Sequence, residues 1–408
     1  MSVKPYKIGL TVLVLSSPYP AFCDSEFTLE GNIKLEVRVF PDSQNTDDYG
    51  RDRLTENLSF SPRVSYKADG YNLSVKPYLS VDSVDSERSN IDLSELYVEF
   101  LRSGSELKLG IDTTFWGVTE SRNLVDIVNQ SNLAAEIDGD TKLGQPLVYW
   151  EKYSDQGNLQ IHWLPYFRER IYPESRERLS IPFLSKSTLY ESGAEEHHQD
   201  FALRWKQSYS AIEVALSYFN GTSREPRLVY FATDNSLHQA YDTISQVGFE
   251  FQWLYQQTTF KAEAIYREGH RNNVEADFTS KQPGFGAVTA GLEYNIYAVF
   301  ATRADLGLIV ELNRDLRPNT APATLYDKDI YLGARLTANN FASTTALAGF
   351  TLDYDDGSTL FTAELSHRLN NNLRLSADIF WIIDASDELL LATIEHDSYI
   401  SLAMSWYF

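Results

Sequence analysis

Phe27 to Val39 read FTLEGNIKLEVRV, and in this stretch two kinds of side chain alternate. The odd positions, such as Leu29 and Ile33, are apolar or glycine, whereas the even positions are Thr, Glu, Asn, Lys and Arg. Successive side chains of a β-strand point to opposite faces of the sheet. The period of two therefore predicts a strand with one apolar face and one polar face.

The same alternation recurs along the whole chain, in about 18 segments by this template. Clear examples are 54–67, 71–81, 212–218, 247–255, 306–312, 373–383 and 400–408, and the weakest are 91–101 and 145–153. Short connections fall near 68–70, 102–105, 154–158, 207–210, 255–258, 339–342 and 369–372. Long connections fall at 40–53, 82–90, 112–145, 169–199, 220–243, 268–284 and 313–328.

This regular alternation of short and long connections favours one architecture. Outer-membrane barrels of bacteria have an even number of antiparallel strands, short periplasmic turns and longer extracellular loops. We therefore predict an all-β fold, a single transmembrane antiparallel β-barrel of about 18 strands with short periplasmic turns and long extracellular loops. A soluble β-sandwich is the alternative, but it gives no reason for connection length to alternate.

The composition is compatible with such a barrel. The mean hydropathy is only -0.32, and no run of 18 apolar residues occurs, which argues against membrane-spanning helices. The chain has 25 Tyr and 22 Phe residues, and barrels need aromatic side chains at both membrane interfaces. The net charge of -22 argues against nucleic acid as a partner.

The aromatic residues on the apolar face fall into two sets, although aromatics favour strands in any case. The set expected at the periplasmic ends is Tyr66, Tyr71, Phe100, Trp205, Tyr255, Tyr294, Trp406 and Phe408. The set expected at the outer ends is Phe167, Phe201, Tyr218, Tyr266 and Tyr354. We interpret them as two interfacial girdles.

The N-terminus has the features of an export signal. A short basic segment precedes the apolar run 8–15, and a small-residue cleavage motif follows. We predict that residues 1–23 are a signal peptide, cleaved before Asp24, and that residues 24–408 form the barrel. Lipidation of Cys23 is the alternative. This is the only cysteine, so cleavage before Asp24 leaves no disulfide and no thiolate metal site.

The polar faces of the strands define a lumen lined by charges of both signs. The predicted lining residues are Lys34, Arg38, Glu95, Glu99, Arg204, Glu250, Lys261, Arg335, Arg374 and Asp378. They form either cross-strand ion pairs in a wet interior or a selectivity ladder along a pore. The surplus acids lie in the long connections, at Asp47, Asp48, Asp52, Asp82, Asp85, Glu87, Glu120, Asp126, Glu136, Asp138, Asp140, Glu191, Glu195 and Glu196. These are either plain solvated charges or ligands that recruit divalent cations between lipopolysaccharide molecules.

The longest connection, at about 112–145, carries many apolar residues without a period of two. Long loops are usually functional or disordered, and an apolar loop needs a surface to bury against. We predict a short amphipathic helix with Ser121 as its N-cap, inside a loop that folds into the lumen and narrows it. Trp116 then packs on the wall, and Arg122, Asp126, Asn129 and Gln130 face the passage. The alternative is an outward cap on neighbouring loops.

No arrangement of residues indicates an enzyme. The seven His residues form no His-Glu-x-x-His motif, and no Gly-x-Ser-x-Gly motif occurs. His162 faces the lumen by the strand alternation. Glu195-Glu196-His197-His198 is a poor preformed metal site, because adjacent side chains in a loop do not converge. We therefore expect no catalytic residue, no cofactor and no metal centre.

Two stretches resemble known families. The final residues 401–408, SLAMSWYF, resemble the terminal strand of outer-membrane barrels, which closes on Phe and is read by the barrel-insertion machinery. A second set, LKLG at 107–110, Phe115-Trp116-Gly117, Asp126, Asn129 and KLGQP at 142–146, resembles porin-like families of unknown function related to alginate-export barrels. Residues 111–112 are Ile-Asp where those families usually have Arg-Gln, and Gln130 stands where many have Pro.

The resemblance and the alternation together imply a Gram-negative outer-membrane channel for diffusion or facilitated passage of small polar solutes. The expected partners are outer-membrane lipid and lipopolysaccharide, divalent cations at acidic loops, and the insertion machinery, which would read the strand ending in Phe408. The alternatives are a polysaccharide export channel, a plugged barrel that acts as a surface-binding or lipid-transfer partner, and a loop-dependent hydrolase.

Overall fold

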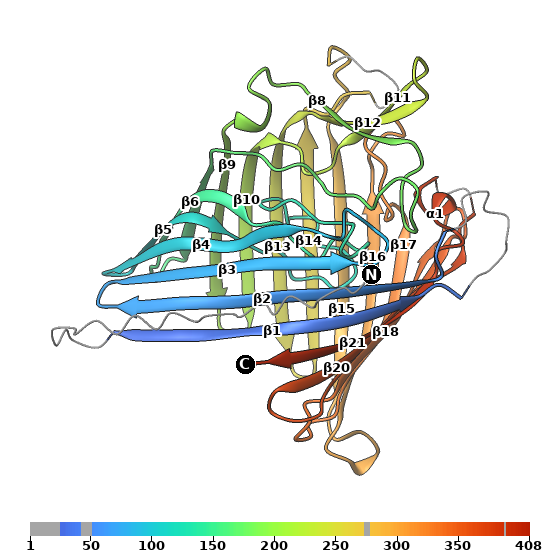
Figure 1. Cartoon of the computed structure of the whole chain (residues 1–408). Helices are drawn as coiled ribbons and strands as arrows, with labels where there is room; N and C mark the ends of the chain where they lie inside the picture. Colours follow the sequence, from blue (N-terminus) through green and yellow to red (C-terminus); the bar gives the residue numbers. More distant parts are fainter. Residues whose placement is uncertain (1–24, 42–50, 273–277, 387–388) are drawn as a thin grey trace, which may run out of the picture.

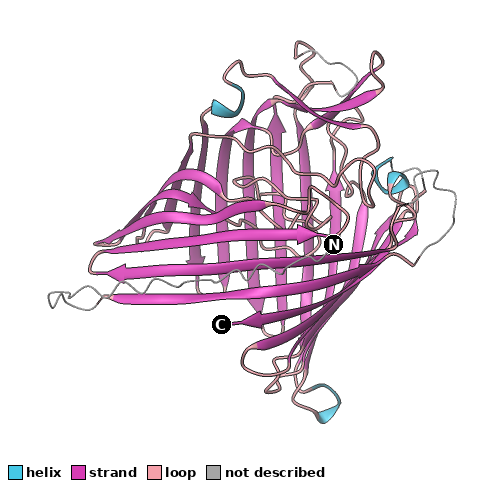
Figure 2. Ribbon diagram, viewed as in Figure 1, coloured by secondary structure: helices cyan, strands magenta, loops and turns pink. Residues whose placement is uncertain are grey.

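The computed structural model describes residues 25–41, 51–272, 278–386 and 389–408. The predicted signal peptide with Cys23, the cleavage site at Asp24, and Asp47 and Asp48 of the first long connection lie outside the described residues. Strands dominate the structure, with three short helical turns (Figure 2). Among the described residues, no helix is long and apolar enough to cross a bilayer.

Eighteen strands form one antiparallel sheet, which closes on itself (Figure 1). They are β1 (Glu26–Val39), β2 (Leu54–Ala68), β3 (Tyr71–Asp82), β4 (Ile91–Arg102), β5 (Ser105–Asp112), β6 (Gln145–Lys152), β7 (Asn158–Leu164), β9 (Asp200–Tyr209), β10 (Ile212–Thr222), β13 (Thr243–Tyr255), β14 (Thr258–Glu268), β15 (Phe285–Ile296), β16 (Asp305–Asp315), β17 (Asp329–Thr337), β18 (Thr345–Asp353), β19 (Thr359–Arg368), β20 (Leu373–Asp384) and β21 (Tyr399–Tyr407). Each strand pairs with the next in the chain, and β1 pairs with both β2 and β21. The predicted antiparallel barrel is confirmed, and the two weakest segments form β4 and β6.

A smaller sheet lies above the long-connection end of the barrel (Figure 1). It contains β8 (Leu184–Tyr190), β11 (Arg227–Phe231) and β12 (Ser236–Tyr241), which belong to two long connections. The helical turns are η1 (Glu195–His197), η2 (Val299–Ala301) and α1 (Leu389–Thr393). The two-residue turn at 69–70 and the 32-residue connection at 113–144 follow directly from the strand bounds and confirm the alternation of connection length.

The barrel has an apolar outside and a charged inside. On β1, Leu35 is 45% exposed on the outer face, whereas its neighbour Glu36 is 6% exposed on the inner face. On β16, Leu312 is 54% exposed and Glu311 only 1%. Soluble proteins bury their apolar side chains, so this inverted arrangement requires an apolar surrounding medium.

Most of the aromatic residues assigned to the two girdles lie on the outer face, and Phe167 is an exception. Tyr71 and Phe201, for example, are clearly exposed. Phe167 is buried, with its ring 4.7 Å from the ring of Tyr241. It is not a girdle residue, because the chain leaves the barrel wall after Leu164, where β7 ends, and passes under the small sheet.

Candidate pore constriction

Residues 113–144, called the inner loop below, connect β5 to β6 and run across the inside of the barrel (Figure 1). They contain bends and turns but no helix, so the predicted helix with Ser121 as N-cap is wrong. The reason lies in which acceptors the backbone N–H groups of the loop bind. In a helix each N–H donates to a carbonyl of the preceding turn, whereas here several donate to carboxylates of the barrel wall.

Glu263 on β14 is the first of two wall carboxylates that hold the inner loop. Its Oε1 atom accepts hydrogen bonds from the backbone N–H of Val118 at 2.7 Å and of Thr119 at 3.1 Å, and from the Thr119 hydroxyl at 2.8 Å. Its other oxygen accepts the N–H of Val125 at 3.3 Å. The carboxylate is completely buried, so its charge is stabilised by these donors rather than by water.

Glu311 on β16 is the second wall carboxylate. It accepts the backbone N–H of Glu120 at 2.9 Å, the N–H of Ser121 at 2.8 Å and the Ser121 hydroxyl at 2.7 Å. Its inward direction follows from the alternation of β16, but the sequence contains no sign that it binds the loop. Glu263 and Glu311 are the functional residues that our candidate site lacked, because their partners are 138 to 191 residues away in the chain.

The apolar side chains of the inner loop pack on the inner wall. Val125 and Val128 are fully buried and Trp116 is 1% exposed. They belong to one cluster with residues of the wall, Leu147, Leu164, Ala202, Phe219, Ile244, Ile265 and Ala287. The guanidinium of Arg204 lies 5.6 Å above the ring of Trp116. Burial of these side chains supplies the driving force that holds an irregular loop inside the lumen.

Asn129 and Gln130 do not face the passage, contrary to our prediction; each is 1% exposed. The Asn129 side chain ties the two ends of the loop together. Its amide donates to the backbone carbonyls of Asp112 at 3.0 Å and Leu143 at 2.8 Å, and its oxygen accepts the N–H of Thr114 at 2.8 Å. Because this amide binds backbone groups at both ends of the loop, it stabilises the loop and cannot bind a solute.

Arg122 and Asp126 also serve as ties. Arg122 donates to the Asp315 carboxylate at 2.9 Å, which fixes the loop to β16. Asp126 pairs with Lys142 at 3.0 Å across the base of the loop. Burial raises the pKa of Asp126, and the Lys142 ammonium opposes that shift. The predicted passage residues therefore lie together in the inner loop but mostly bind the loop and the wall.

The acids at the far end of the loop face open space instead. Residues 134–141 form the loop tip, in which Asp138 and Asp140 are exposed. Both lie within electrostatic reach of Glu136, and Asp138 is also within reach of Glu364 on β19. The surrounding barrel wall removes much of the bulk water around Asp138 although its surface is accessible, and this desolvation together with the neighbouring carboxylates raises its pKa to about 7. Their position inside the barrel agrees with the inward fold predicted for this connection, although they were not among the predicted passage residues.

The loop tip is held from the side of β1 and β20. The guanidinium of Arg38 donates to the carbonyl of Ala135 at 3.2 Å. Ile137 packs against an apolar cluster that includes Phe380 and Tyr399. The inner loop is therefore anchored to the barrel wall at both ends.

The predicted lumen-lining residues all lie on the inner face, and most have partners. Arg204 donates to Glu250 at 2.8 Å, and Lys34 lies 2.7 Å from Glu36. Further contacts join Arg38 to Glu36, Glu95 to Arg63 and Ser74, Glu99 to Asn72, Lys261 to Glu293, Arg335 to Glu293 and Glu120, and Arg374 to the ring of Tyr407. Asp378 lies within electrostatic reach of Lys34. This pattern favours cross-strand pairing over a continuous ladder of free charges.

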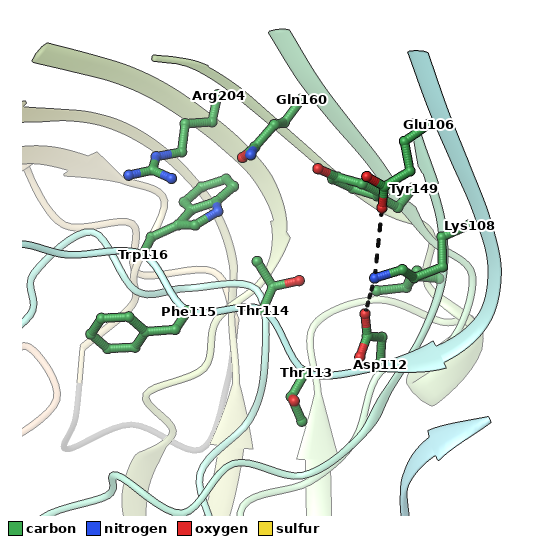
Figure 3. A pocket seen from close by; sticks show the side chains of 11 residues that line it. Glu106, Lys108, Asp112, Thr113, Thr114, Phe115, Trp116, Tyr149, Gln160 and Arg204 are labelled. Atoms are coloured by element: carbon green, nitrogen blue, oxygen red, sulfur yellow. Dashed lines mark hydrogen bonds and ion pairs between the residues drawn. The ribbon is translucent and has the colours of Figure 1, made fainter. Parts of the chain in front are cut away.

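Space remains in the lumen between the inner loop and the short turns. One cavity of about 570 Å³ is bordered by polar side chains of β1 to β5, among them Glu30, Arg63 and Glu99. A second, of about 160 Å³, lies between Trp116 and strands β5 to β7 (Figure 3). In this cavity Lys108 binds Asp112 at 2.6 Å and lies 3.8 Å from Glu106, as the dashed lines in Figure 3 mark.

The described histidines and acids of the outer connections contact different partners and do not form one cluster. His198 is 2.7 Å from Asp200, and this hydrogen bond raises the pKa of His198. The ring of His197 lies 5.5 Å from that of Tyr166. Several acids that we placed in the outer connections have basic partners, Asp82 with Arg88, Glu87 with Lys186 and Glu191 with Arg271.

Comparisons with known proteins return structural likeness only. No protein-family model matches the chain, and no curated protein matches it. Among solved structures, OmpT, an outer membrane protein of Vibrio cholerae in a trimer form, has 10% identity and a TM-score of 0.47, over 94% of this chain and 99% of that one. A triple mutant of the Rhodopseudomonas blastica porin has 12% identity and a TM-score of 0.43, over 94% and 100%. At such values the likeness carries no argument about the function of this chain.

Proposed function

We propose that this chain is a porin-like channel of a Gram-negative outer membrane, which passes small polar solutes through a lumen narrowed by the inner loop. The observation that carries the proposal is the loop itself, which is anchored to the wall by Glu263 and Glu311 and leaves an acidic tip beside open space. A loop built only to cap the barrel would have no reason to bind inner-wall carboxylates at this depth.

The outer surface supports membrane insertion. In hydrocarbon every backbone polar group needs an internal partner, which only helices and closed barrels provide. Here the sheet is closed, and leucines such as Leu58 and Leu402 are more than half exposed on its outer face. Lipid chains would cover these side chains and remove the cost of exposing them to water.

The interior supports the passage of polar solutes with a preference for cations. Asp138 and Asp140 on the loop tip and Glu364 on β19 place negative charge at one opening. A cluster of like charge raises the local concentration of oppositely charged solutes. The basic side chains Lys142, Lys34 and Arg335 are partly neutralised by ion pairs with Asp126, Glu36 and Glu120.

The decisive experiment is single-channel recording of the purified protein in planar lipid bilayers. We expect discrete conductance steps and a reversal potential in a salt gradient that favours cations. The same protein should fractionate with outer membranes and run at different gel positions before and after boiling. A folded protein without conductance would indicate a plugged barrel, and recovery as a soluble periplasmic protein would exclude membrane insertion.

A further inference from the structure

Three aspartates meet at the long-connection end of the barrel, and none of them belongs to the inner loop. Asp327 lies in the connection between β16 and β17, two residues before Asp329, which begins β17, and Asp353 ends β18. Asp329 and Asp353 are direct partners in the antiparallel register. One carboxylate oxygen from each of the three residues lies within 4.8 Å of the others.

Asp329 indicates that the group lacks a ligand. Its side chain is 3% exposed, and one of its carboxylate oxygens is buried without a hydrogen-bond partner. A buried charged group without a partner is strongly unfavourable unless a cation or a donor compensates it. Among the described residues, no Lys or Arg forms an ion pair with Asp329 or Asp353.

The neighbouring residues hold the group in place but neutralise only part of its charge: Lys328 is near Asp327, and Arg122 is within electrostatic reach of Asp329. The N–H groups of Asp355 and Asp356 donate to Oδ1 of Asp353 at 2.6 and 2.9 Å, which orients that carboxylate. Lys328 is 4.0 Å from Asp327 but forms its close ion pair with Asp355. Burial and the adjacent Asp353 raise the pKa of Asp327 to about 6, as expected for acids crowded together.

We propose that Asp327, Asp329 and Asp353 bind one divalent cation, and that this cation is Ca²⁺. The three donors are all carboxylates, which are ligands of hard cations, and no His or Cys is part of the group. Ca²⁺ accepts irregular geometry with water completing its shell, whereas Mg²⁺ demands a near-ideal octahedron. Bound Ca²⁺ would tie the β16–β17 connection to the end of β18 at the mouth of the barrel, whether or not the channel conducts.

Terbium luminescence tests the proposal directly. Tb³⁺ binds Ca²⁺ sites and emits when nearby aromatic side chains are excited, and Tyr331 follows Asp329 on the same face of β17. The full-length barrel in detergent, freed of lipopolysaccharide because its phosphates also bind Tb³⁺, should show saturable emission with one Tb³⁺ per chain. Ca²⁺ should displace Tb³⁺ at a lower concentration than Mg²⁺ does. Absence of saturable emission from the unmodified barrel would overturn the proposal.

Variants locate the site. Asp329→Asn keeps the size of the side chain and removes its charge, so we expect Ca²⁺ affinity to fall by on the order of tenfold or more. Asp155→Asn, the same substitution at an exposed residue of the β6–β7 turn, should leave binding unchanged. If Asp329→Asn does not show the heat-dependent gel shift of a folded barrel, the less buried Asp327→Asn replaces it. Equal affinity in the folded variant and the Asp155→Asn control would contradict the proposal.

Discussion

Two parts of the barrel wall differ in what they do with charge. The covered wall, β9, β10 and β13 to β16, lies under the inner loop, and Glu263 and Glu311 are there 0% and 1% exposed. The bare wall, β17 to β19, is less covered: Arg335 on β17 pairs with Glu120 of the loop, yet its side chain is 37% exposed. On the covered wall, Glu263 and Glu311 accept hydrogen bonds from the inner loop, whereas Glu364 on the bare wall is exposed to the lumen.

This contrast separates structural charges from functional ones on a single inner surface. A carboxylate that accepts several buried N–H groups stabilises a loop, and its removal leaves each donor without a partner. An exposed carboxylate such as Glu364 contributes mainly its field. Substitutions on the two walls should therefore have different consequences, one for the architecture of the pore and the other for its selectivity.

The largest effect should follow from removing the cover. Replacing Ser121 to Asp140 by a short Gly-Ser linker takes away most of the inner loop, so single-channel conductance should rise severalfold. The measurement is conductance in planar bilayers for a variant that still shows the heat-dependent gel shift. If the folded variant conducts like the unmodified protein, the loop does not limit the pore.

The second effect concerns the anchor on the covered wall. Glu263→Ala leaves the N–H groups of Val118, Thr119 and Val125 without their acceptor, at a cost of about 1–3 kcal/mol for each buried donor that stays unpaired. We expect the loop to detach, seen as faster protease cleavage within 113–144 and noisier conductance.

Glu293→Ala is the matched control for the anchor. Glu293 also faces the lumen, on the neighbouring strand β15, but its ion-pair partners are the wall side chains Lys261 and Arg335. Its loss should leave protease cleavage of the loop unchanged. Equal cleavage in both variants would mean that the covered wall has no special role in holding the loop.

A third effect concerns the acids beside the bare wall. Replacing Asp138 and Asp140 by Asn should lower the cation-to-anion permeability ratio about twofold or more at low salt, because their field at the opening is lost. The difference should shrink near 0.1 M salt, where screening acts over about 10 Å. Reversal potentials in salt gradients measure it, with Asp234→Asn on the outer β11–β12 turn as control. An unchanged ratio would exclude the tip as the selectivity element.

The smallest effect should be a pH dependence from Asp138 alone. Its pKa of about 7 lies above the ordinary value, so the folded state holds the proton more tightly than the unfolded state. Protonation as pH falls through 7 therefore favours the folded state slightly and removes one negative charge from the opening. Cation preference should decline between about pH 8 and pH 6 in the unmodified protein. Asp138→Asn should lack this step; a step of equal size in that variant would assign it to another group.

The alternation of side chains determined the barrel without any tertiary information. The alternation of apolar and polar residues shows which face of each strand is apolar. The alternating connection lengths indicate that consecutive strands lie side by side. Both are local properties, so the closed sheet of 18 strands and the inward direction of Lys34, Arg204 and Glu250 followed from the sequence. The apolar residues of the inner loop likewise indicated that it needs a surface.

Only the tertiary structure decided which residues do what inside that barrel. Asn129 and Gln130 are polar and looked available, yet loop closure buries them. Asp138 lies in a connection that the sequence predicted to fold inward, but only the structure shows it exposed beside Glu364. The helix failed because Glu263 and Glu311 compete for its N–H groups from distant strands. Such partners depend on which strands face the inner loop across the lumen. The sequence pattern does not show which distant residues lie close together there.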